Sequence, residues 1–337
     1  MASGSARPGS TRLAKLLYGN VNSYLSSGAA GINGGGAVWG STTGLSSAEL
    51  APFGARSASG QIVRNRMKSV KSIQKITKAM KMVAASKLRN VQVKAENSRG
   101  LWQPFTALLG DAPATKVDKK LIVTISSDKG LCGGINSTVV KYSRALFRLN
   151  GLDGPGKDVK YVIVGEKGKA QLQRDSKKLI GMYFGETQKS SICFTQCSMM
   201  ADEIIKSNEY DAIQMVYNKF NSVVSFQPTV ATMLSPQLLL GDQEVTGDLD
   251  AYEIEGSDTK EEVLQNLSEF QFACTMYNAM LENATSEMGA RMSAMENSTR
   301  NASDMLDRLT LTYNRSRQAS ITTELIEIIS GAAALEG

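Results

Sequence analysis

The 337-residue sequence contains no histidine, few aromatic residues and no apolar run long enough to span a membrane. Without histidine, the commonest general base, the Ser-His-Asp type of triad and the commonest transition-metal ligand are all missing. This absence argues against a hydrolase and against a zinc enzyme. A helix that crosses a bilayer needs roughly 20 apolar residues, so any membrane role must be indirect.

The cysteines are few and scattered. Only Cys193 and Cys197 lie close together, and their spacing is unlike that of a standard CxxC zinc or redox site. We therefore expect Cys132, Cys193, Cys197 and Cys274 to be free thiols in a reducing compartment. The net charge of +6 is compatible with acidic protein, nucleic-acid or membrane partners and selects none of them.

The first 59 residues are rich in Ser, Gly and Ala, and Glu49 is their single acidic residue. This composition, which lacks the apolar core of a secretory signal, predicts an organelle transit peptide over residues 1–59 that is removed from the mature chain. A plain disordered tail is the alternative. Cleavage shortly after Arg56 places the first folded residue near Gln61.

The last eighty residues predict one very long helix over residues 258–332, with a tail over 333–337. Asp258 with Glu261, or Thr259 with Glu262, offers a capping box at its start, and Gly331 is expected to end it. Apolar or small residues recur at spacings of three and four, which is typical of a helix packed along a partner helix. They are Leu267, Phe270, Cys274, Tyr277, Leu281, Ala284 and Met288 and, after an interruption at Arg291, Met295, Ala302, Met305 and Leu309. The alternative is two helices, split near Gly289 or in the weak helix-forming run 296–303.

A second long helix is predicted over residues 60–100, closed by Gly100 and Pro104 and followed by a linker over 101–118. Its broad apolar face holds Val63, Val70, Ile73, Ile76, Thr77, Met80, Val83, Ala84, Leu88, Val91 and Ala95, and its opposite basic face holds Arg64, Lys68, Lys71, Lys75, Lys78 and Arg89. The basic face is either simply solvated or in contact with an acidic partner. Lys87 lies within the apolar arc and must reach a carboxylate, for which Glu287 is a candidate, or extend outward.

Between the two helices, residues 119–240 alternate strands and helices, which predicts an α/β domain with a mainly parallel sheet. The expected strands are Leu121–Ile125, Tyr161–Val164, Ala212–Phe220 and Phe226–Leu234, and the expected helices run to Leu149, near 169–175 and near 198–207. A turn at Asn221 and Ser222 makes the last strand antiparallel. Residues 241–257, rich in acids and glycines, form a loop that leads into the last helix.

Two glycine-rich turns follow the first two strands, at residues 130–134 and 165–168. Neither matches GxGxxG or a P-loop, so we interpret both as tight structural turns, with Gly133 and Gly134 allowing a neighbouring backbone to approach. Cys132 has no histidine to activate it. We assign no catalytic, cofactor-binding or metal-binding residue.

The two long helices differ in predicted length. About 40 residues span on the order of 60 Å and about 70 residues on the order of 100 Å, so an antiparallel pair leaves roughly 40 Å of the last helix unpartnered. That overhang is apolar, and we expect protein from outside this chain to cover it. The alternative is that the tail folds onto its own α/β domain.

Four segments carry a resemblance to a known family: residues 72–88 (SIQKITKAMKMVAASKL), 127–136 (SDKGLCGGIN), 287–295 (EMGARMSAM) and 313–325 (YNRSRQASITTEL). Over about Gln61 to Leu335 the chain resembles the gamma subunit of the rotary (F-type) ATP synthases, in the mitochondrial form of plant-like lineages. The resemblance implies an antiparallel coiled coil of long N- and C-terminal helices flanking a Rossmann-like α/β domain. It implies no catalysis by the isolated chain.

By the same resemblance the chain is the central rotating shaft of that complex, peripheral on the matrix side of the mitochondrial inner membrane. The implied partners are the alpha and beta subunits of the catalytic ring, delta- or epsilon-type central-stalk subunits and the membrane rotor ring. No cofactor, nucleic acid or membrane span is implied. The alternative is a coiled-coil scaffold or nucleic-acid-binding protein with an α/β insert.

The resemblance also assigns contact residues. Arg317, Gln318 and Thr322 match positions that meet the catch loop of a beta subunit, and Lys75, Lys78, Met80 and Lys87 lie where the lever of beta is met. Ile321, Leu325, Ile326, Ile328 and Ile329 form the tip buried in the sleeve, and Tyr252, Glu253 and Glu255 form the foot near the epsilon-type subunit and the rotor ring. Cys193 and Cys197 lack the insertion of the plastid relatives, so thiol regulation is not expected. Residues 181–197 match no family pattern.

Overall fold

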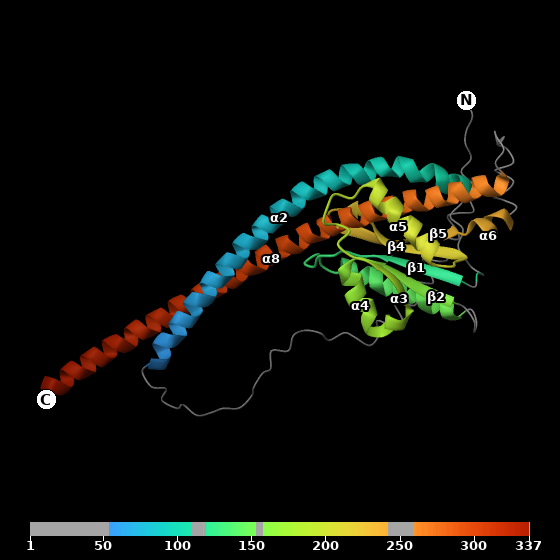
Figure 1. Ribbon diagram of the computed structural model, residues 1–337. Helices are drawn as coiled ribbons and strands as arrows, with labels where there is room; N and C mark the ends of the chain where they lie inside the picture. Colours follow the sequence, from blue (N-terminus) through green and yellow to red (C-terminus); the bar gives the residue numbers. More distant parts are fainter. Residues whose placement is uncertain (1–53, 110–116, 118, 153–157, 242–258, 337) are drawn as a thin grey trace.

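Two long helices and one α/β domain make up the computed structural model (Figure 1). The structure describes residues 54–109, 117, 119–152, 158–241 and 259–336. The predicted transit peptide up to residue 53, and the foot loop from residue 242 onward with Tyr252, Glu253 and Glu255, lie outside the described residues. Within those ranges no helix is both long and apolar enough to cross a bilayer.

Helix α2 (Gly54–Leu109) and helix α8 (Lys260–Glu336) pack along each other in opposite directions and together form what we call the shaft (Figure 1). Contacts along its length fix the register: the hydroxyls of Thr77 and Thr299 are 2.8 Å apart, Lys81 lies 3.2 Å from Glu296, Ser98 donates to Asn278 at 3.1 Å, and Phe105 and Phe270 meet edge to face. The predicted antiparallel coiled coil is confirmed.

The seam of the shaft repeats every seven residues on α2. Val70, Thr77, Ala84 and Ser98 are buried at this spacing, and Leu88 and Ala95 form the companion row. Alanine and serine at the contact allow the helix backbones to approach closely. A strict seven-residue repeat is the pattern of a left-handed coiled coil, in which only two positions per repeat face the partner helix.

The predicted apolar face of α2 is too broad. Ile73, Ile76 and Val83 were expected in the seam but are more than half exposed, because they flank the two contacting rows rather than belong to them. Lys87 is also exposed, so of its two predicted alternatives it extends outward and does not reach Glu287. Glu287 instead pairs with Arg291 one turn further along α8.

Helix α2 does not end at Gly100. It continues through Pro104 to Leu109, although a proline inside a helix removes one backbone hydrogen bond and crowds the carbonyl four residues earlier, here that of Gly100. Trp102 and Phe105 continue the seven-residue rows, and Phe105 packs on Phe270 of α8, which offsets that cost. The register places Gly60, the first residue after the predicted transit peptide, opposite about Ser316, so the overhang shrinks from the predicted 40 Å to roughly 30 Å.

Helix α8 is continuous over 77 residues, so the two-helix alternative is wrong. Thr259 and Glu262 exchange backbone-to-side-chain hydrogen bonds of 3.1 and 3.3 Å, which is one of the two capping boxes predicted. Gly289 does not break the helix: a Cβ there would lie 3.2 Å from the carbonyl oxygen of Val223, so glycine lets the β4–β5 turn approach. Gly331 lies inside α8, and the predicted stop is wrong because the alanines after it continue the helix.

The sheet has the order β3-β2-β1-β4-β5, with the first four strands parallel and β5 antiparallel to β4. The strands are β1 (Lys119–Ile125), β2 (Asp158–Val164), β3 (Ile180–Phe184), β4 (Ala212–Ser222) and β5 (Ser225–Leu234). The helices are α3 (Ile135–Leu152), α4 (Glu166–Ser176), α5 (Phe194–Ser207) and α6 (Pro236–Gly241), with a 3-10 turn, η2, at Lys177–Leu179. The mainly parallel α/β domain is thus confirmed, with an antiparallel edge.

Strand β3 and helix α6 were not predicted, and the β4–β5 turn was misplaced. Strand β3 is a short edge strand whose side chains are half-buried without alternation, so it carries no period-two signal. The chain reverses at Val223 and Val224 rather than at Asn221 and Ser222, and the register shifts between Phe220 and Ser222 where the ladder is irregular.

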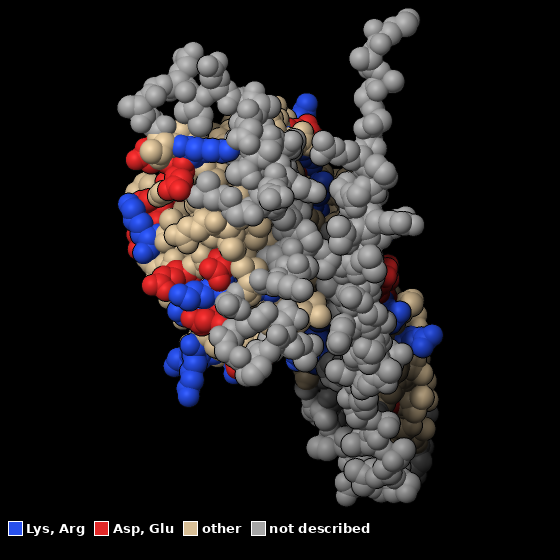
Figure 2. Space-filling model, turned by 90° about the vertical axis from the view of Figure 1, so that its right-hand side faces the viewer, with Lys and Arg blue, Asp and Glu red and all other residues tan. Residues whose placement is uncertain are grey.

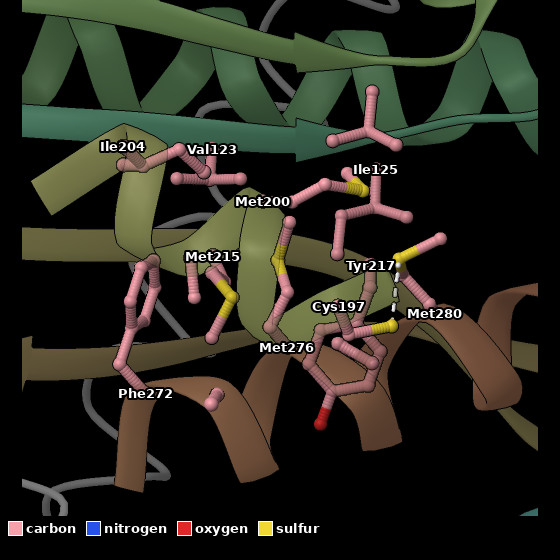
Figure 3. Packing of buried hydrophobic residues seen from close by; sticks show 14 of the residues in the cluster. Val123, Ile125, Cys197, Met200, Ile204, Met215, Tyr217, Phe272, Met276 and Met280 are labelled. Atoms are coloured by element: carbon pink, nitrogen blue, oxygen red, sulfur yellow. Dashed lines mark hydrogen bonds between the residues drawn. The ribbon is translucent and has the colours of Figure 1, made fainter. Parts of the chain in front are cut away.

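The main core lies between one face of the sheet and the layer formed by α5 and α8 (Figure 3). Val123 and Ile125 of β1 face Met200 and Ile204 of α5, and Met276 and Met280 of α8 complete the cluster. A second cluster on the opposite face of the sheet packs α3 and α4. The sheet is therefore fastened to α8 by apolar burial as well as by the polar contacts described below.

The end of the molecule where α8 begins carries charges of both signs side by side (Figure 2). Around the starting edge of the parallel strands, Lys119 pairs with Glu209, and Lys160 lies 3.3 Å from Asp158. On α5, Lys206 lies 2.8 Å from Asp202. Exposed pairs of this kind contribute little stability, so we interpret this edge as a solvated surface.

Candidate functional site

The carboxyl edge of the parallel sheet, where α/β folds usually bind ligands, is occupied by the chain's own groups. Backbone amides at the start of α4 donate to the end of β1: Gly168 to the Ser126 hydroxyl at 2.9 Å, Lys167 to the Ser127 carbonyl at 3.1 Å, and Glu166 to the Asp128 carboxylate at 3.2 Å. These are the amides that would hold a phosphate at a helix N-terminus. In this chain the three amides already donate hydrogen bonds to the residues that follow β1.

The crevice between β1 and β4, where the strand order reverses, is covered by α8. Ser286 of α8 donates to the carbonyl of Asn218 at 3.0 Å, and the amide of Phe220 donates to Glu282 at 2.9 Å. Arg291 of α8 donates to the carbonyl of Gly130 at 3.3 Å. In open α/β sheets this is the expected ligand position. In this chain, α8 occupies that position.

The glycine-rich turns are structural, but their roles differ from those predicted. Gly133 has a φ of 63°, and a Cβ added to it would meet no atom within 4 Å. Glycine is therefore needed there for the left-handed backbone conformation and not for the close approach of a neighbouring backbone. Gly134 also has open space around it. The close approach occurs at Gly165 and Gly168, where a Cβ would lie 2.6 and 2.5 Å from oxygen atoms of Ser126.

The cysteines are free thiols, as expected. Burial raises the pKa of the Cys132 thiol, raises that of Cys197 to about 12, and raises that of Cys274 to about 11. These three thiols are therefore neutral at physiological pH and are not activated nucleophiles. Only Cys193 is exposed among the four. In the described part of the chain no cluster of metal-ligating side chains forms.

The first exposed face of the shaft lies on α2. Lys75, Lys78 and Lys87 are exposed and Met80 is half-buried, so the structure brings the predicted lever residues to one stretch of α2 outside the seam. The remaining residues of the basic face, Arg64, Lys68, Lys71 and Arg89, are exposed as well. Ile73, Ile76, Met82 and Val83 add exposed apolar surface to the same stretch. The face is therefore both basic and apolar.

The second exposed face is the tip, which we define as residues 321–336 of α8. Ile321, Leu325, Ile326, Ile328 and Ile329 are 55 to 69% exposed. The tip extends away from the α/β domain, at the opposite end of the shaft (Figure 1). The alternative in which the tail folds onto its own sheet is therefore wrong. Aliphatic side chains so exposed and so close together mark an interaction surface.

The predicted catch-loop residues lie at the root of the tip. Arg317, Gln318 and Thr322 are exposed, and the Thr322 hydroxyl donates to the Gln318 carbonyl at 2.9 Å within the helix. Arg317 has no ion-pair partner among the described residues. Its guanidinium is available to an acidic group from another chain.

Sequence reasoning missed a set of buried polar contacts around the middle of α8. Asn278, Glu282, Asn283, Ser286 and Glu287 are each at most 2% exposed. The sequence did contain a signal for these contacts. Five polar residues lie within ten positions of one another, in a stretch whose other residues are largely Ala, Met and Leu. A helix face that is polar yet flanked by core residues on both sides must meet polar partners inside the protein.

Comparisons with known proteins agree with this architecture. A protein-family model described as ATP synthase matches residues 59–335. The mitochondrial ATP synthase subunit gamma of Arabidopsis thaliana is 67% identical over 287 residues, covering 84% of this chain and 88% of that protein. The corresponding subunit of Ipomoea batatas is 66% identical over 294 residues, covering 86% and 90%.

Among solved structures, a chain of the Euglena gracilis mitochondrial ATP synthase (OSCP/F1/c-ring, rotational state 3) matches with a TM-score of 0.71. It is 22% identical, over 83% of this chain and 95% of that one, which shows the fold alone. Fold and exposed faces define a shaft-like protein, in which an antiparallel helix pair carries an α/β domain and ends in an exposed apolar tip. Within that class, the chain belongs to the gamma-subunit family of ATP synthases.

Proposed function

We propose that this chain is the central rotating shaft of the mitochondrial ATP synthase, and that it couples proton-driven rotation of a membrane rotor ring to ATP synthesis in the beta subunits. The observation that carries the proposal is the tip: a helix end with five large aliphatic side chains exposed, in a family whose members are ATP synthase gamma subunits. In the described residues, the carboxyl edge of the sheet, where an α/β fold would hold a nucleotide, is occupied by the chain's own groups. Catalysis therefore belongs to other subunits.

The mechanism follows from asymmetry. The shaft has a basic and apolar face on α2, a different face on α8, and an α/β domain on one side only (Figure 1). As it turns inside a ring of alpha and beta subunits, each beta subunit meets these faces in sequence. Each face favours a different conformation of the beta site, which is a coupling free energy between the rotor ring and the nucleotide sites.

We propose the same contacts that the resemblance implies. Arg317, Gln318 and Thr322 meet the catch loop of a beta subunit, and the exposed stretch with Lys75, Lys78, Met80 and Lys87 meets its lever. Charge-assisted hydrogen bonds from Arg317 suit an acidic loop. The five aliphatic residues of the tip are buried in the sleeve of the ring, where each large side chain contributes on the order of 1.5 to 3 kcal/mol.

We place the chain on the matrix side of the inner mitochondrial membrane, as a peripheral component. Its transit peptide, residues 1–59, is removed after import. The foot, with Tyr252, Glu253 and Glu255, contacts the delta- or epsilon-type central-stalk subunits and the rotor ring. These assignments rest on the mitochondrial relatives and on the composition of the two segments.

Reversal of charge at Arg317 tests the catch-loop contact. In the assembled complex, Arg317→Glu is expected to lower coupled ATP turnover about tenfold or more, because a charge-assisted contact becomes a repulsive one. The matched control is Arg308→Glu, which reverses an exposed charge earlier on α8. Equal turnover of the two variants per assembled complex would show that Arg317 does not make this contact.

A further inference from the structure

The middle of α8 is enclosed by the rest of the chain. From Gln271 to Glu287 all residues except Tyr277 are buried, because α2 packs on one side and the sheet with α5 on the other. The apolar residues in this stretch are mostly small or flexible: Ala273, Met276, Ala279, Met280 and Ala284. Such a surface holds its neighbours by burial, but it is adaptable and does little to fix the angle of the helix about its own axis.

Hydrogen bonds and ion pairs, which are directional, fix that angle. Among them, those of Glu282 join α8 to both of its neighbours, α2 and the sheet. One of its carboxylate oxygens accepts a hydrogen bond from Nε of Arg99 on α2 at 2.8 Å and forms an ion pair with Nη2 of the same guanidinium, also at 2.8 Å. Its other oxygen accepts the backbone amide of Phe220 at the end of β4, at 2.9 Å. Glu282 is 1% exposed. A single buried carboxylate on α8 thus holds both the second helix and the α/β domain.

Two neutral contacts flank this junction. Ser98 of α2 donates to Asn278 at 3.1 Å, and Asn218 of β4 donates to Asn283 at 3.0 Å. Each joins α8 to one neighbour only. Glu282 lies between them along α8 and joins both neighbours, and it carries the charge that makes its hydrogen bonds strong.

We propose that Glu282 is a positioning residue that makes the two helices and the α/β domain turn as one body under torque; this inference rests on the shaft function proposed above. Rotation of α8 about its axis in one direction lengthens the bonds to Arg99, and rotation in the other lengthens the bond to Phe220. The junction therefore resists slip in both directions. Without it, part of the rotation that enters at the foot is lost before it reaches the tip.

The test uses the complete complex in sealed membrane vesicles and compares ATP hydrolysis with ATP-driven proton uptake, both per assembled complex. Glu282→Gln keeps the size of the side chain and removes its charge, and Arg99→Met removes the contact to α2. For both variants we expect the ratio of protons taken up to ATP hydrolysed to fall roughly threefold or more, because a buried charged contact is lost. Arg99→Lys retains the charge but not the paired geometry and is expected to restore the ratio in part.

The matched control is Lys206→Met, which breaks an exposed pair, Lys206 with Asp202 at 2.8 Å, on the surface of α5. Its ratio is expected to stay unchanged. The inference is overturned if Glu282→Gln and Arg99→Met keep the normal ratio, or if they lower only the amount of complex, as a purely structural role predicts. A separate arm tests the shaft function itself: complexes lacking this chain must lose ATP-driven proton uptake, whatever the variants do.

Discussion

At the scale of single residues, Ser126 lies at the carboxyl edge of the sheet, where a nucleotide-binding fold would hold a phosphate. Its hydroxyl donates to the carbonyl of Val164 at 2.8 Å and accepts the amide of Gly168 at 2.9 Å. This arrangement needs glycine at residues 165 and 168, because a Cβ at either would collide with Ser126. The chain has thus closed the position that a phosphate would occupy and has used it to join β1 to α4.

Replacement of Gly165 tests this closure. Gly165 has a φ of 100°, and a Cβ there would lie 2.6 Å from the Ser126 carbonyl oxygen, so Gly165→Ala is expected to lower the free energy of unfolding by roughly 3 kcal/mol. Gly134→Ala, which meets nothing within 4 Å, is the control and is expected to change little. Urea unfolding followed by circular dichroism measures both. Equal midpoints would contradict the proposed role of the Gly165 turn.

Cys197 gives a pH-dependent prediction. Burial raises the pKa of its thiol from 9.0 to about 12, so above pH 9 the thiol ionises in the unfolded chain but stays protonated in the folded one. The free energy of unfolding therefore falls as pH rises from 9 towards 12, by up to about 1.4 kcal/mol per pH unit from this group. Cys197→Ala is expected to make that decline shallower over the same range, as measured by urea unfolding at several pH values. Parallel curves for the two chains would exclude this contribution.

At the scale of elements, the sequence patterns predicted what depends on local repetition. The Thr259–Glu262 capping box and most strands of the sheet are encoded within a few residues, and the structure confirms them. The apolar stripes correctly predicted that the two helices pack on each other, although Ile73, Ile76 and Val83 lie outside the contact. The continuation of α2 through Pro104 and the edge strand β3 were missed because distant contacts decide them: Phe105 meets Phe270, and β3 pairs with β2. The width of the seam was also overestimated, since an apolar residue at helical spacing does not reveal whether its partner is in this chain.

The candidate site was likewise predicted only where the exposed residues form a local pattern in the sequence. The sequence predicted an exposed apolar tip and a basic face on α2, and both lie on the surface of the described chain. The buried junction at Glu282 was not predicted, because its partners Arg99 and Phe220 are far away in the sequence. A polar residue within an apolar stretch signals a partner but does not identify it.

Neighbouring residues of α2 provide a test of the seam. Ala84 is 3% exposed in the contact with α8, so Ala84→Leu overfills it and is expected to lower the free energy of unfolding by about 1 to 3 kcal/mol. Val83→Leu, on an adjacent exposed position, is the control and is expected to change it by less than about 0.5 kcal/mol. Urea unfolding distinguishes them. A larger effect at Val83 than at Ala84 would contradict the seven-residue seam.

At the scale of the whole molecule, the chain is a long helix pair that carries the α/β domain near one end (Figure 1). Helix α8 spans on the order of 115 Å, which is far more than an α/β domain is wide, and α2 accompanies it over most of that length. The α/β domain lies beside the shaft at the end away from the tip (Figure 1). An exposed apolar tip of this kind marks a surface to which other proteins bind.

Truncation tests the tip. Removal of residues 321–337 is expected to lower the yield of assembled complex about tenfold or more, because the buried aliphatic surface is lost, while the urea midpoint of the α/β domain stays unchanged. Removal of residues 335–337 alone is the control and is expected to leave the yield near normal. Unfolding of the α/β domain in the longer truncation would mean that the tip stabilises its own chain, against the arrangement observed.

The central claim is that this chain turns inside a stationary ring, and Cys193 offers a place to observe it. Cys193 is the exposed one of the four cysteines and immediately precedes α5 on the α/β domain, away from the tip. A bead attached there, on complexes immobilised through the catalytic ring, is expected to rotate in one direction when ATP is added and to stop when ATP is removed. ATP hydrolysis by the same complexes with a stationary bead would contradict the account.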